Sequence, residues 1–175
     1  LSLLFQVGGG DFVKAPDVPV EGAPVAMAAA DLEGDGDVDL AIAPQSDTGV
    51  ALLFNDGNGT FAPAVKVPVG VASARALAVA DLNGDGAPDL AVPDHSAASV
   101  AVALNQGGGV FGPVVHFNVG VGPTSIVVTD VDGDGAPDLV TADDGSGEEL
   151  HAIGLLLFDD GFESNNTSAW SATSP

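Results

Sequence analysis

Residues 81–90 read Asp-Leu-Asn-Gly-Asp-Gly-Ala-Pro-Asp-Leu, and the same pattern occurs twice more in the chain. The earlier copy, residues 31–40, reads Asp-Leu-Glu-Gly-Asp-Gly-Asp-Val-Asp-Leu. The later copy, residues 130–139, reads Asp-Val-Asp-Gly-Asp-Gly-Ala-Pro-Asp-Leu. The steps between the copies are 50 and 49 residues, which indicates a chain built from a repeat of that length.

A second motif has the same period but a different phase. Residues 3–12, 52–61 and 102–111 each run from a short apolar segment through a Gly-rich turn to a Phe, and residues 155–162 form a shortened fourth copy. Two unrelated motifs that share one period make a chance match implausible. The repeats extend over about residues 3–51, 52–101 and 102–154, with a partial strand at 155–162.

Short apolar segments flank both motifs and are typical of strands. Residues 76–80 and 125–129 lead into the Asp-rich segment, and residues 50–54 and 100–104 run into the Gly-rich turns. Together with the segments that follow each motif, this gives about four strands per period, as in a blade of a β-propeller. The sequence therefore predicts an all-β domain, residues 1–162, made of about three four-stranded antiparallel repeats. Residues 163–175 form a Ser/Thr-rich tail.

The Asp-rich segments have the residue spacing of a calcium loop. In a tight loop the oxygens of residues 1, 3 and 5 converge, the carbonyl of residue 7 adds a ligand, and a carboxylate at residue 9 completes a shell of six to eight oxygens. The predicted ligands are Asp31, Glu33, Asp35, the carbonyl of Asp37 and Asp39 in the first loop; Asp81, Asn83, Asp85, the carbonyl of Ala87 and Asp89 in the second; and Asp130, Asp132, Asp134, the carbonyl of Ala136 and Asp138 in the third.

Other interpretations of these loops fit less well. An EF-hand requires Glu at position 12, where this chain has Ile42, Val92 and Thr141, and it requires helices rather than strands on both sides. Magnesium is disfavoured because so many protein oxygens suit a larger and more flexible shell. Asp and Gly also form turns without any metal, but three loops in register favour metal binding. We expect about three Ca²⁺ ions per chain.

The repeats resemble those of the FG-GAP (VCBS-type) family. The resemblance rests on Phe111-Gly-Pro, Gly22-Ala-Pro and the three Asp-rich loops, and it covers essentially residues 3–162. This sequence departs from the family pattern in three places. Phe12-Val and Phe61-Ala lack the Phe-Gly pair, and Gly70-Val-Ala-Ser stands in place of Gly-Ala-Pro. The resemblance implies blades like those of integrin-alpha β-propellers and of many secreted bacterial proteins.

Charge and composition exclude several classes of function. The chain has 25 acidic and 3 basic residues, a formal net charge of −22, and this repels nucleic acid and anionic lipid. Residues 96–129 lack charged side chains, but Gly and Pro interrupt them, so we expect no membrane insertion. The absence of cysteine excludes thiolate metal sites and disulfides.

No catalytic motif is present in the sequence. His95, His116 and His151 share no motif with one another, and no acidic residue lies beside them at the spacing of a zinc protease. We therefore expect a protein that is not an enzyme; an enzyme that carries these repeats would need a catalytic domain beyond residue 175. The sequons at Asn58, Asn165 and Asn166 matter only in an organism that glycosylates them.

We expect a secreted or surface-bound structural or adhesion protein stabilised by calcium. The tail, from Phe158 to Trp170, resembles terminal segments of secreted bacterial proteins and also the opening strand of some jelly-roll modules. Apolar strands at residues 3–5 and 154–158 predict head-to-tail strand pairing between copies, in an oligomer or a filament. The alternatives are a propeller module that binds a glycan or a protein, and a fragment of a longer secreted chain.

Overall fold

The computed structural model describes residues 1–45, 48–145 and 150–153, of which 150–153 are described by their backbone alone. A two-stranded hairpin consists of β1 (Leu4–Gly8) and β2 (Asp11–Lys14). The first sheet contains β3 (Pro24–Ala30), β4 (Asp39–Pro44), β5 (Gly49–Leu53) and β6 (Val65–Pro68). The second contains β7 (Ala78–Ala80), β8 (Asp89–Asp94), β9 (Ser99–Asn105) and β10 (Phe111–Asn118). The third contains β11 (Pro123–Thr129), β12 (Asp138–Asp143) and β13 (Leu150–Ile153).

Every sheet is an antiparallel meander in which neighbours along the chain are neighbours in space. No described residue lies in a helix, and none of the described segments forms a helix able to span a membrane. The predicted all-β class with propeller-like blades is confirmed.

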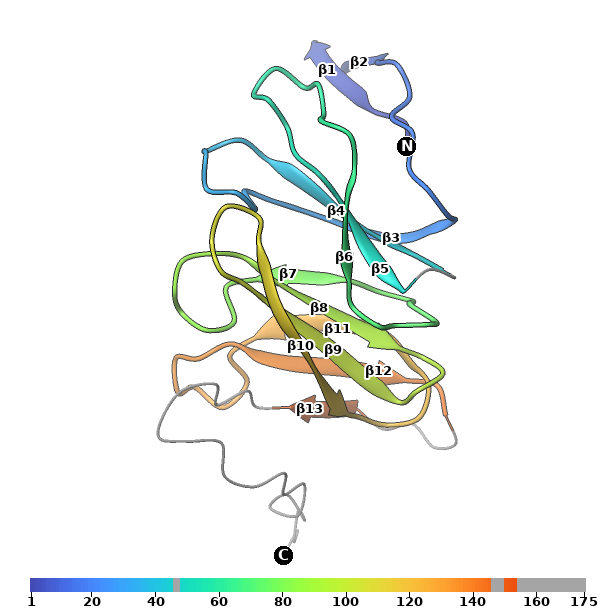
Figure 1. The fold of residues 1–175 in the computed structure, drawn as a ribbon, viewed down its shortest axis with the longest axis vertical. Coiled ribbons are helices and arrows are strands. Elements are labelled where there is room, and N and C mark those ends of the chain that lie inside the picture. The colour runs from blue at the N-terminus through green and yellow to red at the C-terminus, as the bar shows by residue number, and fades with distance from the viewer. Residues whose placement is uncertain (46–47, 146–149, 154–175) are drawn as a thin grey trace, which may run out of the picture.

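The sheets are stacked face to face along the molecule, with the hairpin at one end (Figure 1). Strand β8 in the second sheet shows how the stack is held together. Leu90 and Val92 point into the apolar cluster shared with the first sheet, whereas Ala91 points into the cluster shared with the third. Because both faces of β8 are covered, its sequence is a continuous apolar run rather than an alternation of apolar and polar residues.

The hairpin corresponds to the third and fourth strands of a complete sheet. Asn55 pairs with Phe61 at the β5–β6 turn, and Asn105 pairs with Phe111 at the β9–β10 turn. Gln6 and Phe12 form the same pair at the turn between β1 and β2. The Gly-rich motif thus sets the same register in three places along the chain.

The first and the second sheet each take their strands from two sequence periods. The first sheet begins at β3, inside the repeat that starts at residue 3, and ends at β6, inside the repeat that starts at residue 52. The strand predicted around residues 154–158 and the tail at 163–175 lie outside the described residues. The third strand of the third sheet is β13, which pairs with β12.

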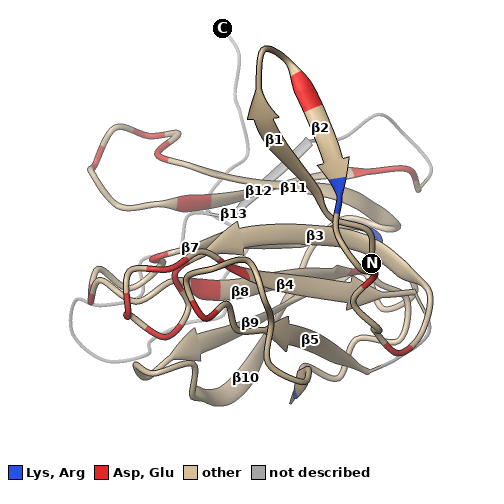
Figure 2. Cartoon of the chain, turned by 90° about the horizontal axis from the view of Figure 1, so that it is seen from above, with Lys and Arg blue, Asp and Glu red and all other residues tan. Residues whose placement is uncertain are grey.

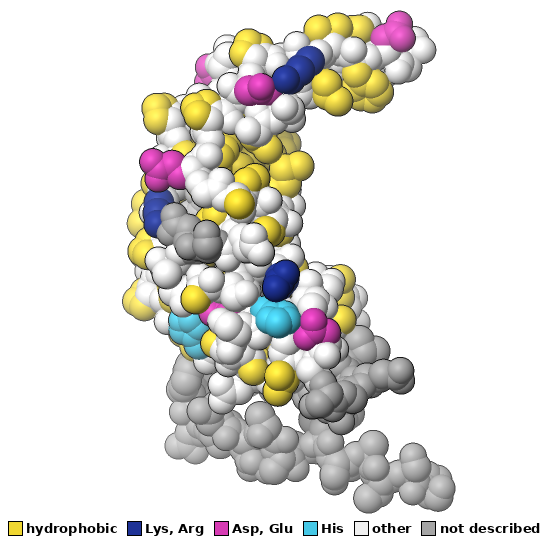
Figure 3. Space-filling model, turned by 90° about the vertical axis from the view of Figure 1, so that its right-hand side faces the viewer, with side chains coloured by type: hydrophobic (Ala, Val, Ile, Leu, Met, Phe, Trp, Pro, Cys, Tyr) yellow, Lys and Arg dark blue, Asp and Glu magenta, His cyan; other side chains and the backbone are white. Residues whose placement is uncertain are grey.

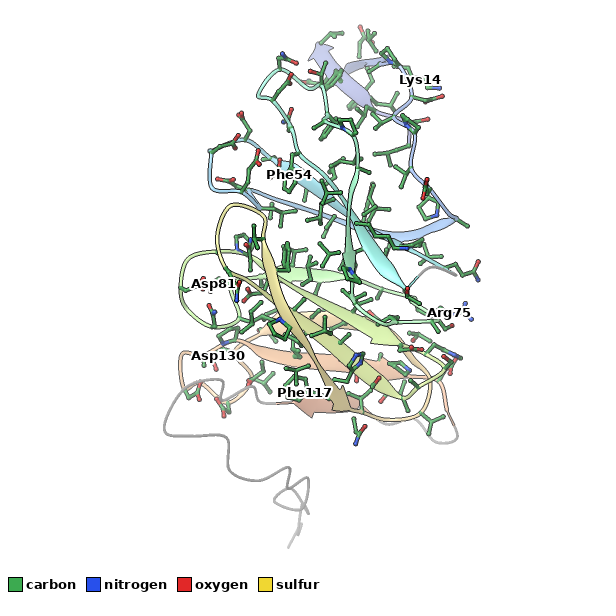
Figure 4. All side chains as sticks on the ribbon, viewed as in Figure 1. Lys14, Phe54, Arg75, Asp81, Phe117 and Asp130 are labelled. Atoms are coloured by element: carbon green, nitrogen blue, oxygen red, sulfur yellow. The ribbon has the colours of Figure 1, made fainter. Side chains whose placement is uncertain are left out.

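The Asp-rich loops project from the same edge of the stack. Figure 2 shows that many of the described Asp and Glu residues lie on the loops at this edge. Asp81 and Asp130 lie there, while Arg75 lies at the opposite edge (Figure 4). Much of the negative charge of the described residues is therefore gathered at one side of the molecule.

Candidate metal centres

Each Asp-rich loop joins the first and second strands of a sheet. The loops, which we call the first (residues 31–39), second (81–89) and third (130–138) loop, connect β3 to β4, β7 to β8 and β11 to β12. Strand pairing closes them, because the ninth residue of each loop pairs with the residue just before the loop. These pairs are Ala30 with Asp39, Ala80 with Asp89 and Thr129 with Asp138.

The first Asp of each loop organises the turn. Asp81 accepts hydrogen bonds from the backbone N–H groups of Gly84 and Asp85 at Oδ1, at 2.8 and 3.1 Å, and from Gly86 at Oδ2, at 2.8 Å. Asp31 and Asp130 accept the corresponding bonds from the glycines of their own loops. These bonds wrap the loop backbone around the carboxylate of its first residue.

Two glycines in each loop have a left-handed backbone, which other residues adopt at a cost. In the second loop the φ angles are +76° at Gly84 and +90° at Gly86. A Cβ atom at either glycine would meet no other atom within 4 Å. The requirement for glycine here is therefore one of backbone conformation and not of space.

The fifth residue of each loop lies on the exposed side. Asp85 accepts a hydrogen bond from the N–H of Ala87 at 2.8 Å and another from the Asn83 amide at 2.9 Å. These two bonds lower the pKa of Asp85, so that its carboxylate is ionised and available to a cation at neutral pH.

The ninth residue has a structural role that the sequence analysis did not include. Asp89 is fully buried, and its two oxygens accept the N–H groups of Asn105 at 2.7 Å and of Leu82 at 2.8 Å. Asp39 holds Asn55 and Leu32 in the same way, both at 2.8 Å. Asp89 thereby fixes the end of β9 to the beginning of the loop. Burial raises its pKa, an effect that these two hydrogen bonds partly offset.

The third loop brings three predicted ligands together. Asp130, Asp132 and Asp138 each place a carboxylate oxygen within 4.8 Å of the others. Two ligands on opposite sides of a Ca²⁺ ion, each at about 2.3–2.6 Å, lie about 4.6–5.2 Å apart, so this group fits a single ion. The donors are all carboxylate oxygens, which are the ligands that calcium prefers.

The carboxylates of the first and second loops are more spread out. Among the described residues, neither loop brings three acidic side chains into a group as tight as that of the third. In the second loop, position 3 is Asn83, which bonds to Asp85. In the first loop, burial and the nearby charges of Asp35 and Asp39 raise the pKa of Glu33, so a cation there would relieve repulsion.

The first and second loops lie side by side around a shared hollow. Its volume is about 380 Å³, and its lining comes from both loops and from the β9–β10 turn: Asp31, Glu33, Gly34, Asp85, Gly86, Ala87, Pro88, Gly107 and Gly108. A second hollow of about 570 Å³ lies over β5 and β6 and the segment before β3. Its lining is mainly apolar and includes Val18, Pro19, Val20, Pro44, Phe61 and Pro63, together with Glu21 and Lys66.

Two functional positions were missed by the sequence analysis. Asn105 is buried and bonds to both the first and the second loop, and Asp94 closes the β8–β9 turn. A signal for Asn105 was present, because Asn55 occurs one period earlier in the same Gly-rich motif. Its partner could not be identified from the sequence, since Leu32 lies 73 residues away.

The chain belongs to the FG-GAP-like repeat family, whose model matches residues 31–92 and 93–141. The resemblance drawn from the Asp-rich loops is thereby confirmed. A search of curated proteins gives no match.

The solved structures that are similar to this chain include a lectin and a toxin complex. A lectin of Agrocybe aegerita, whose structure concerns recognition of non-reducing terminal N-acetylglucosamine, is 31% identical over 65% of this chain, with a TM-score of 0.47. The Photorhabdus luminescens Tc holotoxin pore is 22% identical over 87% of this chain, with a TM-score of 0.55. The present chain covers 31% and 8% of the lengths of these two chains. The similarity to the holotoxin supports the fold alone.

Proposed function

We propose that this chain is a calcium-stabilised extracellular module whose role is structural or adhesive. The observation that carries the proposal is the group formed by Asp130, Asp132 and Asp138, in a loop whose hydrogen bonds recur in the other two loops. These loop residues would hold the ion through carboxylate and carbonyl oxygens. A bound calcium supplies positive charge that joins the two strands on either side of the loop.

The charge of the chain supports calcium as a structural element. Eleven of the 25 acidic residues are predicted side-chain ligands, and they crowd at one edge of the stack. Without a cation their mutual repulsion opposes folding. At a calcium concentration of about 100 times Kd, each site adds roughly 2.7 kcal/mol to the stability of the folded state.

We propose an extracellular location, where the calcium concentration suits sites with the modest affinity typical of such modules. Extracellular calcium modules bind at about 10⁻⁴ to 10⁻³ M, a range that is filled outside the cell and empty in the cytosol. The absence of cysteine agrees with stabilisation by metal instead of by disulfides. We propose that the chain has no enzymatic activity of its own, because the candidate site consists of oxygen ligands around a turn.

Self-assembly is the proposed route to an adhesive or structural role. In the first sheet β5 pairs with both β4 and β6, whereas its counterpart β1 pairs with β2 alone among the described strands. Leu4 and Val7 on β1 are 63% and 62% exposed, and apolar side chains gather over the hairpin (Figure 3). We propose that a strand of a second copy pairs with this edge, head to tail.

Binding of a glycan or a protein is the second candidate function. The hollow of about 570 Å³ over β5 and β6 favours it, because an apolar concave surface with a few polar groups is the usual form of a ligand site. A glycan array and a pull-down with the calcium-loaded monomer would test this candidate. Reproducible binding by a monomer that does not assemble would favour it over self-assembly.

Thermal unfolding tests the calcium proposal. We expect EGTA to lower Tm by many degrees, and Ca²⁺ to restore it more effectively than Mg²⁺. The Asp134→Asn variant keeps the turn-forming oxygen but removes a ligand charge, so it should lose part of the calcium effect and little stability in EGTA. A Tm that does not change with EGTA, in protein shown to contain no metal, would overturn the proposal.

Light scattering tests the assembly proposal. We expect particles larger than a monomer in calcium, and smaller ones after Val7→Lys places a charge on the edge of β1. Val110→Lys, a matched exposed valine outside the hairpin, is the control and should assemble normally. A stable calcium-loaded monomer would rule the assembly out while leaving the calcium proposal intact.

A further inference from the structure

Asn105 connects two neighbouring metal loops. Its side chain is 1% exposed, and its Nδ2 atom donates hydrogen bonds to the carbonyl of Leu32 at 2.8 Å and to the carbonyl of Pro88 at 3.1 Å. Leu32 is the second residue of the first loop, and Pro88 is the eighth residue of the second. A single buried amide group therefore bonds to the backbone of both loops.

Both ends of this connection are held by the loops themselves. The N–H of Leu32 bonds to Asp39, the ninth residue of the first loop. The N–H of Asn105 bonds to Asp89, the ninth residue of the second loop. Asn105 bonds to the backbone of both loops. When an ion orders one loop, that ordering therefore also restrains the backbone of the other loop.

Asn55 provides an internal comparison. It occupies the same register position one period earlier, its N–H bonds to Asp39, and its amide donates to the carbonyl of Val38, the eighth residue of its own loop. Asn55 and Asn105 therefore make the same two bonds to the ninth and eighth residues of the loop in their own sheet. Their side-chain oxygens accept from different glycines of the turn, Gly59 and Gly107, and Asn105 alone of the two also bonds to Leu32 in the neighbouring sheet.

We propose that Asn105 couples calcium binding at the first and second loops, so that an ion in one loop raises the affinity of the other. This inference rests on the proposed calcium binding. Asn105 acts as a positioning residue. Its side-chain amide bonds to the backbones of both loops, and its backbone N–H bonds to Asp89, a predicted ligand of the second loop.

The sign of the coupling separates this mechanism from direct electrostatics. Two bound Ca²⁺ ions repel each other, so the field between the loops across their shared hollow can produce only negative coupling. Positive coupling requires a structural element that links the two sites and whose conformational equilibrium both bound ions shift in the same direction. The net contribution of one buried hydrogen bond corresponds to about a 3- to 10-fold increase in affinity.

Calcium titration by calorimetry tests the proposal in protein whose third loop is silenced by Asp134→Asn. The affinity of the second loop is measured with the first loop intact and again with the first loop silenced by Asp35→Asn. We expect silencing the first loop to weaken binding at the second loop by about 3- to 10-fold. With Asn105→Ser this ratio should fall to one or below, and with the matched control Asn55→Ser it should persist.

Hydrogen exchange provides a readout that does not depend on affinity. In the Asp35→Asn protein, filling the second loop with calcium should slow exchange of the Leu32 amide, and Asn105→Ser should abolish this slowing. If Asn105→Ser does not fold, the affinity ratio of the second loop, measured with Asn105 in place, still tests the coupling. A ratio of one would overturn it. Calcium binding with a ratio that Asn105→Ser leaves unchanged also overturns it. An absence of calcium binding in every variant overturns the proposed function and the coupling together.

Discussion

The ring of Phe54, at the end of β5, lies against Gly109 in the turn between β9 and β10. A Cβ atom on Gly109 would lie 2.5 Å from Cζ of Phe54, which is closer than any stable contact. The same contact occurs one sheet earlier, where a Cβ on Gly59 would lie 2.6 Å from Cζ of Phe5. A phenylalanine of one sheet and a glycine of the next thus define how closely neighbouring sheets approach.

Gly109→Ala should therefore destabilise the protein more than Gly108→Ala. Both glycines have a positive φ, at +70° and +63°, so each alanine carries a backbone cost of about 1–2 kcal/mol. A Cβ at Gly108 meets no atom within 4 Å, so the difference between the two variants measures the clash with Phe54. Urea unfolding gives both values. Equal losses would show that the sheets separate to accommodate the methyl group at no cost.

Asp89→Ala should destabilise the protein with or without calcium. The substitution leaves the buried N–H groups of Leu82 and Asn105 without their acceptor, at a cost of about 1–3 kcal/mol each. The comparison is made by urea unfolding in EGTA and in saturating Ca²⁺. A loss of stability seen in calcium alone would mean that Asp89 serves as a ligand and contributes little to the loop backbone.

Asp85→Asn should have the opposite dependence on calcium. Asp85 is exposed, and an asparagine retains the oxygen that accepts the N–H of Ala87. We expect a lower Tm in Ca²⁺ and a nearly unchanged Tm in EGTA, because the variant loses a ligand charge and, of its two hydrogen bonds, only the exposed one from the Asn83 amide. An equal loss in both conditions would contradict the assignment of Asp85 as a ligand.

Asp94 should make stability depend on pH without involving metal. It is 3% exposed, and burial acts to raise its pKa, but hydrogen bonds from Ser96, Ala72 and Ala97 outweigh burial and lower the pKa below its ordinary value. A lowered pKa in the folded state means that the unfolded state binds the proton more tightly. The stability from Asp94 is therefore complete above its ordinary pKa and is lost as the pH falls through the lowered value.

The measurement compares wild type with Asp94→Asn by urea unfolding in EGTA between neutral pH and about pH 3. We expect the stability gap between them to be constant at neutral pH and to shrink below about pH 4, where the carboxylate becomes protonated. A gap that widens on acidification would show that burial, and not hydrogen bonding, dominates the pKa of this group.

The strands were most predictable at the centre of the first and second sheets, where β4, β5, β8 and β9 are buried almost throughout. The predicted strands at residues 50–54, 100–104 and 125–129 correspond to β5, β9 and β11, with ends that differ by one or two residues. Short apolar runs between Gly-rich turns favour strands whatever their partners are. The four strands per period that the repeat predicted are found in the first and second sheets, and three strands of the third sheet lie within the described residues.

The contacts between sheets were not predictable in the same way. The bond from Asn105 to Leu32 and the contact of Phe54 with Gly109 depend on how far one sheet rotates against the next. Periodicity along the chain does not specify that rotation. The candidate ligands were identified from their spacing, but the burial of Asp89 became apparent only when the β9 backbone was placed beside it.

The first and second sheets each combine strands from two sequence periods, and this affects how such a chain can lengthen. A duplicated segment of about 50 residues, the repeat length found here, begins inside one sheet and ends inside the next, so it carries part of each. Inserted in tandem, it restores both parts and adds one sheet, with its own Asp-rich loop and its own interface on each side. Tandem duplication can therefore lengthen this molecule wherever the break falls within the repeat, with no new contacts to be invented.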